Sequence, residues 1–260
     1  MSSELQAAVE NAYREFAHYR LKGTVYVCNC PVCVDAQTER DLCTVPLRQI
    51  SARLLAEYTH SGHGWDDRIA DDFRYFLPRY FELIAAGAPP SNVGIETCLG
   101  QLYVSNYRTG WPSSEVAAID AFFLALVRAQ LAASVHIDRT GIPALQEEEL
   151  EDILCMIANA DGDLAEVLAV WDSDRSRTAT LRIAHIISVA KWRKKLLANA
   201  FWDGLSRPRV EAGMRQVMAW LVRPETRERL EAACLAEQDA DAAALLSHAE
   251  GLVAGLPRAG

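Results

Sequence analysis

The spacing of apolar residues constrains this chain most, because they recur every three to four positions along nearly its whole length. Leu150, Ile153 and Ile157 are one example, and this spacing places side chains on one face of an α-helix. No segment shows the convincing alternation of apolar and polar residues that a half-buried strand would have. The sequence therefore predicts an all-α protein.

Proline and capping residues divide this pattern into separate helices. Pro208 and Pro224 stand where a first helical residue is expected, because the N–H that proline lacks would be unpaired there anyway. Ser51 is a candidate N-cap. Continuous helices are predicted over about residues 92–106 and 176–203. The whole chain would then form roughly ten helices joined by short turns.

The arrangement of these helices has two candidate forms. Helix pairs recur at roughly 35 to 45 residues, which is the period of HEAT-like units. No matching residues recur between the pairs, so a multi-layer bundle fits equally well. We predict a multi-helix array or bundle with a cysteine-rich loop near the N-terminus. Residues 1–260 are treated as one helical domain, and any boundary is expected near Gly141–Pro143.

The charge and the termini restrict the partners. The formal net charge is −9, which repels nucleic-acid phosphates at long range and favours a basic partner, although such a charge also serves solubility. The N-terminus Met1-Ser2-Ser3-Glu4 has neither a basic nor an apolar leader, and no apolar run reaches the ~18 residues of a membrane span. We therefore expect a cytoplasmic protein without membrane contact.

The strongest chemical signal is a group of cysteines near the N-terminus. Cys30-Pro31-Val32-Cys33 is a CxxC knuckle, and two thiolates at this spacing can face one ion from a tight turn. Structural zinc takes four such ligands in a tetrahedron. The candidate zinc ligands are Cys28, Cys30, Cys33 and Cys43, with His60 or His63 as a replacement for one of them.

Three other interpretations of the cysteines remain open. They could be free thiols packed near a helix end. A redox CxxC is less favoured, because it usually occurs in a βαβ setting that this chain lacks. An open catalytic zinc would need a nearby base, for which Asp66-Asp67 and Asp71-Asp72 are available.

A basic run at Lys191–Lys195 is the only dense cluster of positive charge. Together with Arg175, Arg177 and Arg182 it would make one face of the predicted 176–203 helix positive. Such a face could bind a phosphate or an acidic partner. The alternative, which we favour, is a solvated face that pairs with the acidic residues of 147–152.

Several motifs occur in a fixed order in the first half of the chain. They are Cys30-Pro31-Val32-Cys33, Pro46-Leu47-Arg48, Asp72-Phe73-Arg74-Tyr75-Phe76-Leu77-Pro78-Arg79, and Trp111-Pro112 with Glu115. In this order they resemble a widespread group of uncharacterised bacterial helical proteins. The resemblance implies a helical fold and a bacterial, cytoplasmic setting, and it assigns no catalytic residue.

Familiar catalytic motifs are missing from the sequence: it has no nucleophile elbow, phosphate-binding loop, HExxH motif or dinucleotide fingerprint. Our first hypothesis is a non-enzymatic helical module that binds another protein. Its specific form is an immunity- or antitoxin-type protein, steered by its acidic charge to a basic partner. The alternatives are a metal-dependent enzyme that uses the Cys/His loop region and a nucleic-acid-linked regulator that uses Lys191–Lys195.

Overall fold

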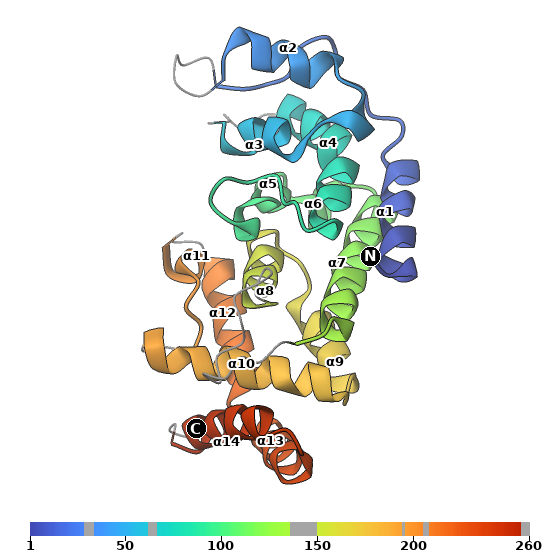
Figure 1. Cartoon of the computed structure of the whole chain (residues 1–260). Coiled ribbons are helices and arrows are strands. Elements are labelled where there is room, and N and C mark those ends of the chain that lie inside the picture. Colours follow the sequence, from blue (N-terminus) through green and yellow to red (C-terminus); the bar gives the residue numbers. More distant parts are fainter. Residues whose placement is uncertain (29–33, 62–66, 136–149, 194–195, 205–207, 256–260) are drawn as a thin grey trace. The chain divides into compact units, whose positions relative to one another are not determined.

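The structure is a computed structural model of the chain. It describes residues 1–28, 34–61, 67–135, 150–193, 196–204 and 208–255. These residues form fourteen α-helices and two short 3-10 helices, without any strand (Figure 1). The prediction of an all-α, multi-helix protein is therefore confirmed. Within the described part, none of the helices is both long and apolar enough to cross a membrane.

The chain divides into two compact units. The first holds residues 1–126 and 159–162, and the second holds residues 127–158 and 163–260. One division falls inside helix α7, Ser113–Ala132, which supplies residues to both units. The predicted boundary near Gly141–Pro143 lies outside the described residues, and the single helical domain over 1–260 stays a prediction.

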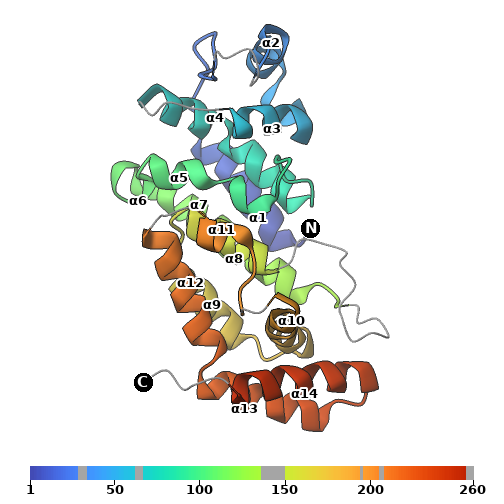
Figure 2. The same ribbon diagram turned by 90° about the vertical axis from the view of Figure 1, so that its left-hand side faces the viewer.

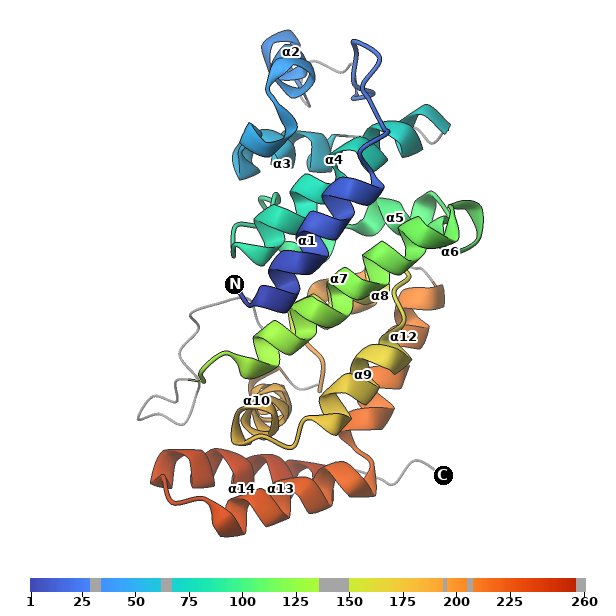
Figure 3. The same cartoon turned by 90° about the vertical axis from the view of Figure 1, so that its right-hand side faces the viewer.

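The first unit is built around helix α4, Asp67–Ala85, which carries a broad aromatic face. Phe73, Phe76 and Phe81 of this face are buried, and the ring of Phe81 stacks on that of Phe122 with centroids 3.9 Å apart. Helix α1, Ser3–Glu15, packs along α4 (Figure 3). The other elements of this unit are α2 (Ala36–Thr44), η1 (Leu47–Gln49), α3 (Ala52–His60), η2 (Ile95–Thr97), α5 (Gly100–Val104) and α6 (Tyr107–Gly110).

A buried carboxylate, Glu115, lies at the centre of a polar cluster in the first unit. Its Oε1 accepts a hydrogen bond from the Tyr19 hydroxyl at 2.7 Å, and its Oε2 lies 3.5 Å from Nε of Arg74. The guanidinium of Arg74 lies 4.2 Å from the centroid of the Trp111 ring. The cluster therefore links the segment after α1 to α4 and to the first turn of α7, where a negative charge also suits the helix dipole.

The second unit contains a group of three packed helices. Helices α13 (Pro224–Ala236) and α14 (Ala240–Ala254) form a hairpin that packs against α10 (Arg177–Arg193) (Figure 3). Helix α9, Leu164–Ser173, packs beside α12, Pro208–Leu221 (Figure 2). The remaining helices of this unit are α8 (Leu150–Asn159) and α11 (Ala200–Gly204).

Predictions that depend on local backbone chemistry agree with the structure. Ser51 caps α3, and its Oγ accepts a hydrogen bond from the Leu54 N–H at 3.1 Å. Pro208 and Pro224 are the first residues of α12 and α13. These features involve neighbours within one helical turn, so the sequence suffices to predict them.

Two predicted continuous helices are wrong. The segment predicted as helix over about 92–106 contains only the short elements η2 and α5, and Asn106, just before α6, has a left-handed φ of 56°. The helix predicted over 176–203 ends at Arg193, and α11 begins at Ala200. In the second case the buried Glu151 accepts hydrogen bonds from the Ala198 and Asn199 backbone N–H groups at 2.5 and 2.9 Å. A distant carboxylate thus replaces the helical partners of these N–H groups.

Candidate functional site

The predicted zinc ligands are only partly within the described chain. Cys30, Cys33 and His63 lie outside the described residues. Cys28 and Cys43 are both half-buried free thiols. Within the described part, no three His, Cys, Asp or Glu side chains are grouped as a metal site would require. The zinc site therefore stays a prediction.

Cys43 lies near the end of α2 in an acidic setting. Burial raises the pKa of its thiol, and the negative charges of Glu39 and Asp72 raise it further, against a hydrogen bond from the Val25 backbone. The thiol is therefore protonated at neutral pH, and zinc would have to displace that proton. The segment that carries Cys28 lies nearby, because Val25 is only three residues before it.

His60, the alternate ligand, already serves a structural purpose. Its Nε2 accepts a hydrogen bond from the Asn92 N–H at 2.9 Å and lies 3.2 Å from Oγ of Ser91. These contacts tie the end of α3 to the segment before η2. A metal ion at Nε2 would replace the hydrogen bond from Asn92.

The predicted basic face of the 176–203 helix is divided by the structure. Arg182 is turned to the Ala133 backbone oxygen, to which its Nη2 donates at 3.3 Å. The side chains of Lys191–Lys195 lie outside the described part, so pairing with 147–152 stays a prediction. Arg175 and Arg177, in contrast, lie together at the start of α10.

Arg175 and Arg177 line a pocket of about 440 Å³ in the second unit. Its wall comes from the first turns of α10, the end of α13 and the middle of α14. Its apolar part is formed by four residues: Leu181, Ala233, Ala236 and Leu246. The polar part consists of five residues: Arg175, Arg177, Thr180, Glu237 and Gln238. We refer to it below as the arginine pocket.

The start of α10 positions both arginines of the pocket. Ser176 caps the helix, since its Oγ accepts from the Ala179 N–H at 3.2 Å, and its own N–H donates to Oδ1 of Asp174 at 2.9 Å. The cap places Arg175 just before the helix and Arg177 in its first turn. The positive end of the α10 dipole therefore lies at the same place as the two guanidinium groups.

Arg177 and Arg175 differ in their partners. Nε of Arg177 donates to Oε2 of Glu237 at 2.7 Å, and Oε1 of Glu237 accepts from the Gln238 and Asp239 N–H groups at 3.0 Å each. The pKa of Glu237 is lowered, first by the Arg177 hydrogen bond and then by that of the Asp239 backbone. Arg175 is exposed, and no carboxylate of the described residues forms an ion pair with it.

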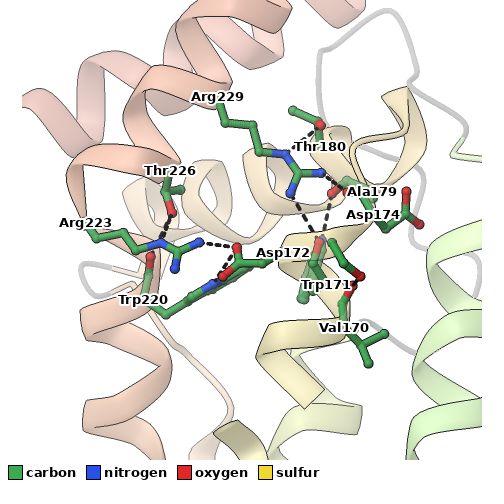
Figure 4. A network of polar contacts seen from close by, with 11 residues as sticks. Val170, Trp171, Asp172, Asp174, Ala179, Thr180, Trp220, Arg223, Thr226 and Arg229 are labelled. Atoms are coloured by element: carbon green, nitrogen blue, oxygen red, sulfur yellow. Dashed lines mark hydrogen bonds and ion pairs between the residues drawn. The ribbon is translucent and has the colours of Figure 1, made fainter. Parts of the chain in front are cut away.

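A third arginine, Arg229 of α13, is buried and contacts Thr180 of the pocket lining (Figure 4). Its Nε donates to Oγ1 of Thr180 at 2.9 Å, and its Nη1 and Nη2 donate to the backbone oxygens of Trp171 and Asp174 at 3.3 and 2.6 Å. All three acceptors are uncharged. Arg229 therefore joins α13 to the end of α9 and the start of α10.

The charge of Arg229 is only partly balanced. Its pKa is lowered to about 10, first by burial and then by the nearby Arg175, while Asp172 and Asp174 act in the opposite direction. Even so, the group stays protonated at neutral pH, because its pKa is still well above 7. The wall of the arginine pocket thus contains Thr180, whose hydroxyl is in direct contact with a buried cation.

The other half of the network holds α12 and α13 to the end of α9 (Figure 4). Asp172 forms an ion pair with Arg223 and accepts a hydrogen bond from Nε1 of Trp220 at 3.1 Å. The ring of Trp220 packs on Trp171 with centroids 5.0 Å apart. The hydroxyl of Thr226 donates to the Trp220 backbone oxygen at 2.8 Å. These contacts fix the framework on which the pocket is built.

Sequence reasoning identified the two pocket arginines but missed the buried one. Arg227 and Arg229 are two positions apart in α13, and both occur in a charged stretch. Only the fold distinguishes them, since Arg227 pairs with Glu250 on the surface, whereas Arg229 is buried. No local pattern would have found this difference.

Comparison of the chain with protein-family models, with curated proteins and with solved structures finds no match.

Proposed function

We propose that this chain is a non-enzymatic helical module that binds another protein, and that the arginine pocket receives part of that partner. The observation that carries the proposal is the pocket itself. It combines an apolar part with two guanidinium groups, and its lining residue Thr180 accepts a hydrogen bond from the buried Arg229. Preformed pockets that hold one anchoring side chain are typical centres of protein interfaces.

The specific form that we propose is an immunity- or antitoxin-type protein of the bacterial cytoplasm with a basic partner. The net charge of −9 supports it, because an acidic protein attracts a basic one at long range and speeds their encounter. The pocket supports contact with one acidic residue of that partner. The two requirements are compatible, since a basic protein still presents individual carboxylates.

The proposal is tested by capturing the partner with the whole chain and with two tryptophan variants. Ala236 and Ala244 are both exposed alanines of the α13–α14 hairpin, but only Ala236 lines the pocket. The immobilised protein is incubated with a lysate of its source organism, and retained proteins are identified by mass spectrometry. We expect one partner to bind the parent and Ala244→Trp, and to be lost with Ala236→Trp.

Two results would contradict this function. One is that no protein is retained in a stable complex at low salt, where charge steering is strongest. The other is that Ala236→Trp retains every partner as well as Ala244→Trp does. Circular dichroism of both variants, compared with the parent, shows that any loss is not due to unfolding.

A further inference from the structure

We propose that the arginine pocket binds a carboxylate that carries an apolar group, with Arg175 as the residue that pairs with it. This inference depends on the proposed function only in taking the pocket as the docking site. The shared chemistry has two sources, namely an acidic residue beside an apolar one in a polypeptide, or a small free acid. Four observations lead to this assignment.

The first observation is the balance of charge around the pocket. Its lining holds two guanidinium groups and one carboxylate, so one positive charge is left over. Glu237 is saturated, because Arg177 and two backbone N–H groups all donate to it. Arg175 is the group whose charge is left for a ligand. One excess positive charge suits a monoanion, and the fixed Glu237 disfavours a dianion.

The second observation concerns two other carboxylates, Asp174, which precedes Arg175 in the sequence, and Asp239, which lies near Arg177. Oδ1 of Asp174 accepts from the Ser176 N–H at 2.9 Å, and Oδ1 of Asp239 accepts from the Ala242 N–H at 2.9 Å. Asp239 therefore caps α14, and Asp174 stabilises the turn before α10, so turning either side chain toward an arginine would cost a hydrogen bond. A ligand carboxylate can pair with Arg175 without breaking such a hydrogen bond.

The third observation is the buried cation Arg229, which donates a hydrogen bond to Thr180 of the pocket lining. Arg229 and Arg175 repel each other, and the hydrogen bonds of Arg229 all go to uncharged oxygens. An anion beside Arg175 would reduce this repulsion, because it would lie in the field of both guanidinium groups. The positive end of the α10 dipole acts in the same direction.

The fourth observation is the apolar floor. Leu181 and Leu246 are fully buried, and Ala233 and Ala236 leave space above them because their side chains are short. A volume of about 440 Å³ accommodates a side chain or a small acid but not an extended peptide. An apolar group on the ligand would cover Ala233 and Ala236, which are still accessible to water, while its carboxylate stays with Arg175 at the rim.

The test is an NMR titration of the whole chain with 3-phenylpropionate, following the backbone amides of Thr180 and Gln238. The neutral 3-phenylpropanamide is the matched control for charge. We expect saturable shifts with the acid only, and binding about tenfold weaker in Arg175→Gln, because a charge-assisted hydrogen bond is lost. Arg215→Gln, an exposed arginine of α12 that pairs with Glu211, should bind as the parent does.

Two further probes identify the source and the charge of the ligand. If acetyl-Leu-Glu-Leu-amide binds more tightly than 3-phenylpropionate, the proposal is supported and the carboxylate comes from a polypeptide. If 3-phenylpropionate binds more tightly, the proposal is supported and the ligand is a small acid. Phenyl phosphate, mostly a dianion at pH 7.5, should bind more weakly than the carboxylate. A phosphate that binds more tightly would overturn the assignment to a monoanion.

The proposal is overturned if neither carboxylate probe shifts these amides, if the amide control binds as well as the acid, or if Arg175→Gln has no effect. These outcomes differ from a failure of the proposed function. If the acid binds but no partner protein is captured, the proposed ligand chemistry is supported and the protein-binding role is wrong. If Ala236→Trp abolishes partner binding but no carboxylate probe binds, the protein-binding role is supported and the proposed ligand chemistry is wrong.

Discussion

Nε of Arg229 donates a hydrogen bond to Oγ1 of Thr180 at 2.9 Å, although the two residues are 49 positions apart in the sequence. Thr180 belongs to the first turn of α10, and its hydroxyl also donates to the Ser176 backbone oxygen at 3.0 Å. One buried guanidinium thus stabilises the helix start that positions Arg175 and Arg177. The candidate ligand site depends on this contact, even though Arg229 itself does not line the pocket.

Replacing Arg229 should therefore destabilise the second unit. In Arg229→Gln the oxygens of Thr180, Trp171 and Asp174 lose their donors in a buried place, which costs about 2–3 kcal/mol of unfolding free energy. Urea unfolding followed by tryptophan fluorescence measures the change. Arg227→Gln is the control, because Arg227 is half-exposed and its loss costs about 0.5 kcal/mol or less. Equal effects of the two changes would contradict the role given to Arg229.

The buried Glu115 should make a comparable contribution to the first unit. Glu115→Ala removes the acceptor of the Tyr19 hydroxyl and leaves Arg74 without its buried carboxylate, so we expect a loss of about 3 kcal/mol. Ser114→Ala, an exposed change in the same turn of α7, should have little effect. Chemical denaturation of the three proteins gives the comparison. A loss below about 1 kcal/mol would show that the ion pair is not important for stability.

The first unit should lose stability at alkaline pH because of its tyrosines. The pKa values of Tyr13, Tyr19, Tyr58 and Tyr80 are raised above 10.0, in each case first by burial. The raised pKa values stabilise the folded state fully below about pH 10, where the unfolded tyrosine is also protonated, and this stabilisation is lost as the pH rises above that value. Tyr80 is fully buried, so it should contribute clearly to this loss.

Tyr80→Phe provides the measurement of this pH dependence. Unfolding free energies of the parent and the variant, taken at about pH 8 and about pH 11, should converge at the higher pH, because the variant lacks one titrating group. Tyrosinate absorbance should rise together with loss of the helical signal. Full ionisation of all tyrosines near pH 10 in a protein that keeps its near-ultraviolet signal would contradict the prediction.

The predicted zinc site is tested by elemental analysis of protein purified without a histidine tag under reducing conditions. If Cys28, Cys30, Cys33 and Cys43 hold a structural ion, we expect about one zinc per chain. Cys43→Ser should lower the zinc content, and Cys155→Ser, a change of a buried cysteine in the second unit, should not. A chelator would then destabilise the N-terminal part of the chain. Protein free of zinc would leave these residues as free thiols.

The helical class of this protein could be predicted because it depends on short-range chemistry. The three-to-four residue spacing, the cap at Ser51 and the prolines at 208 and 224 act within a single turn, so the sequence contains all the necessary information. The early cysteines and the arginines at 175 and 177 could be singled out in the same way, from residue type and proximity along the chain.

The positions where helices break, in contrast, were decided by the tertiary structure. Glu151 accepts hydrogen bonds from the backbone N–H groups at 198 and 199, which are not helical although the sequence predicts a helix there, and nothing in that segment indicates this contact. The burial of Arg229 and the assembly of α10, α13 and α14 around the pocket depend in the same way on residues that are far apart in the sequence. Local preference sets which segments are helical, because it acts between neighbours, whereas the burial of a charge and the shape of a pocket depend on which distant side chains the fold brings together.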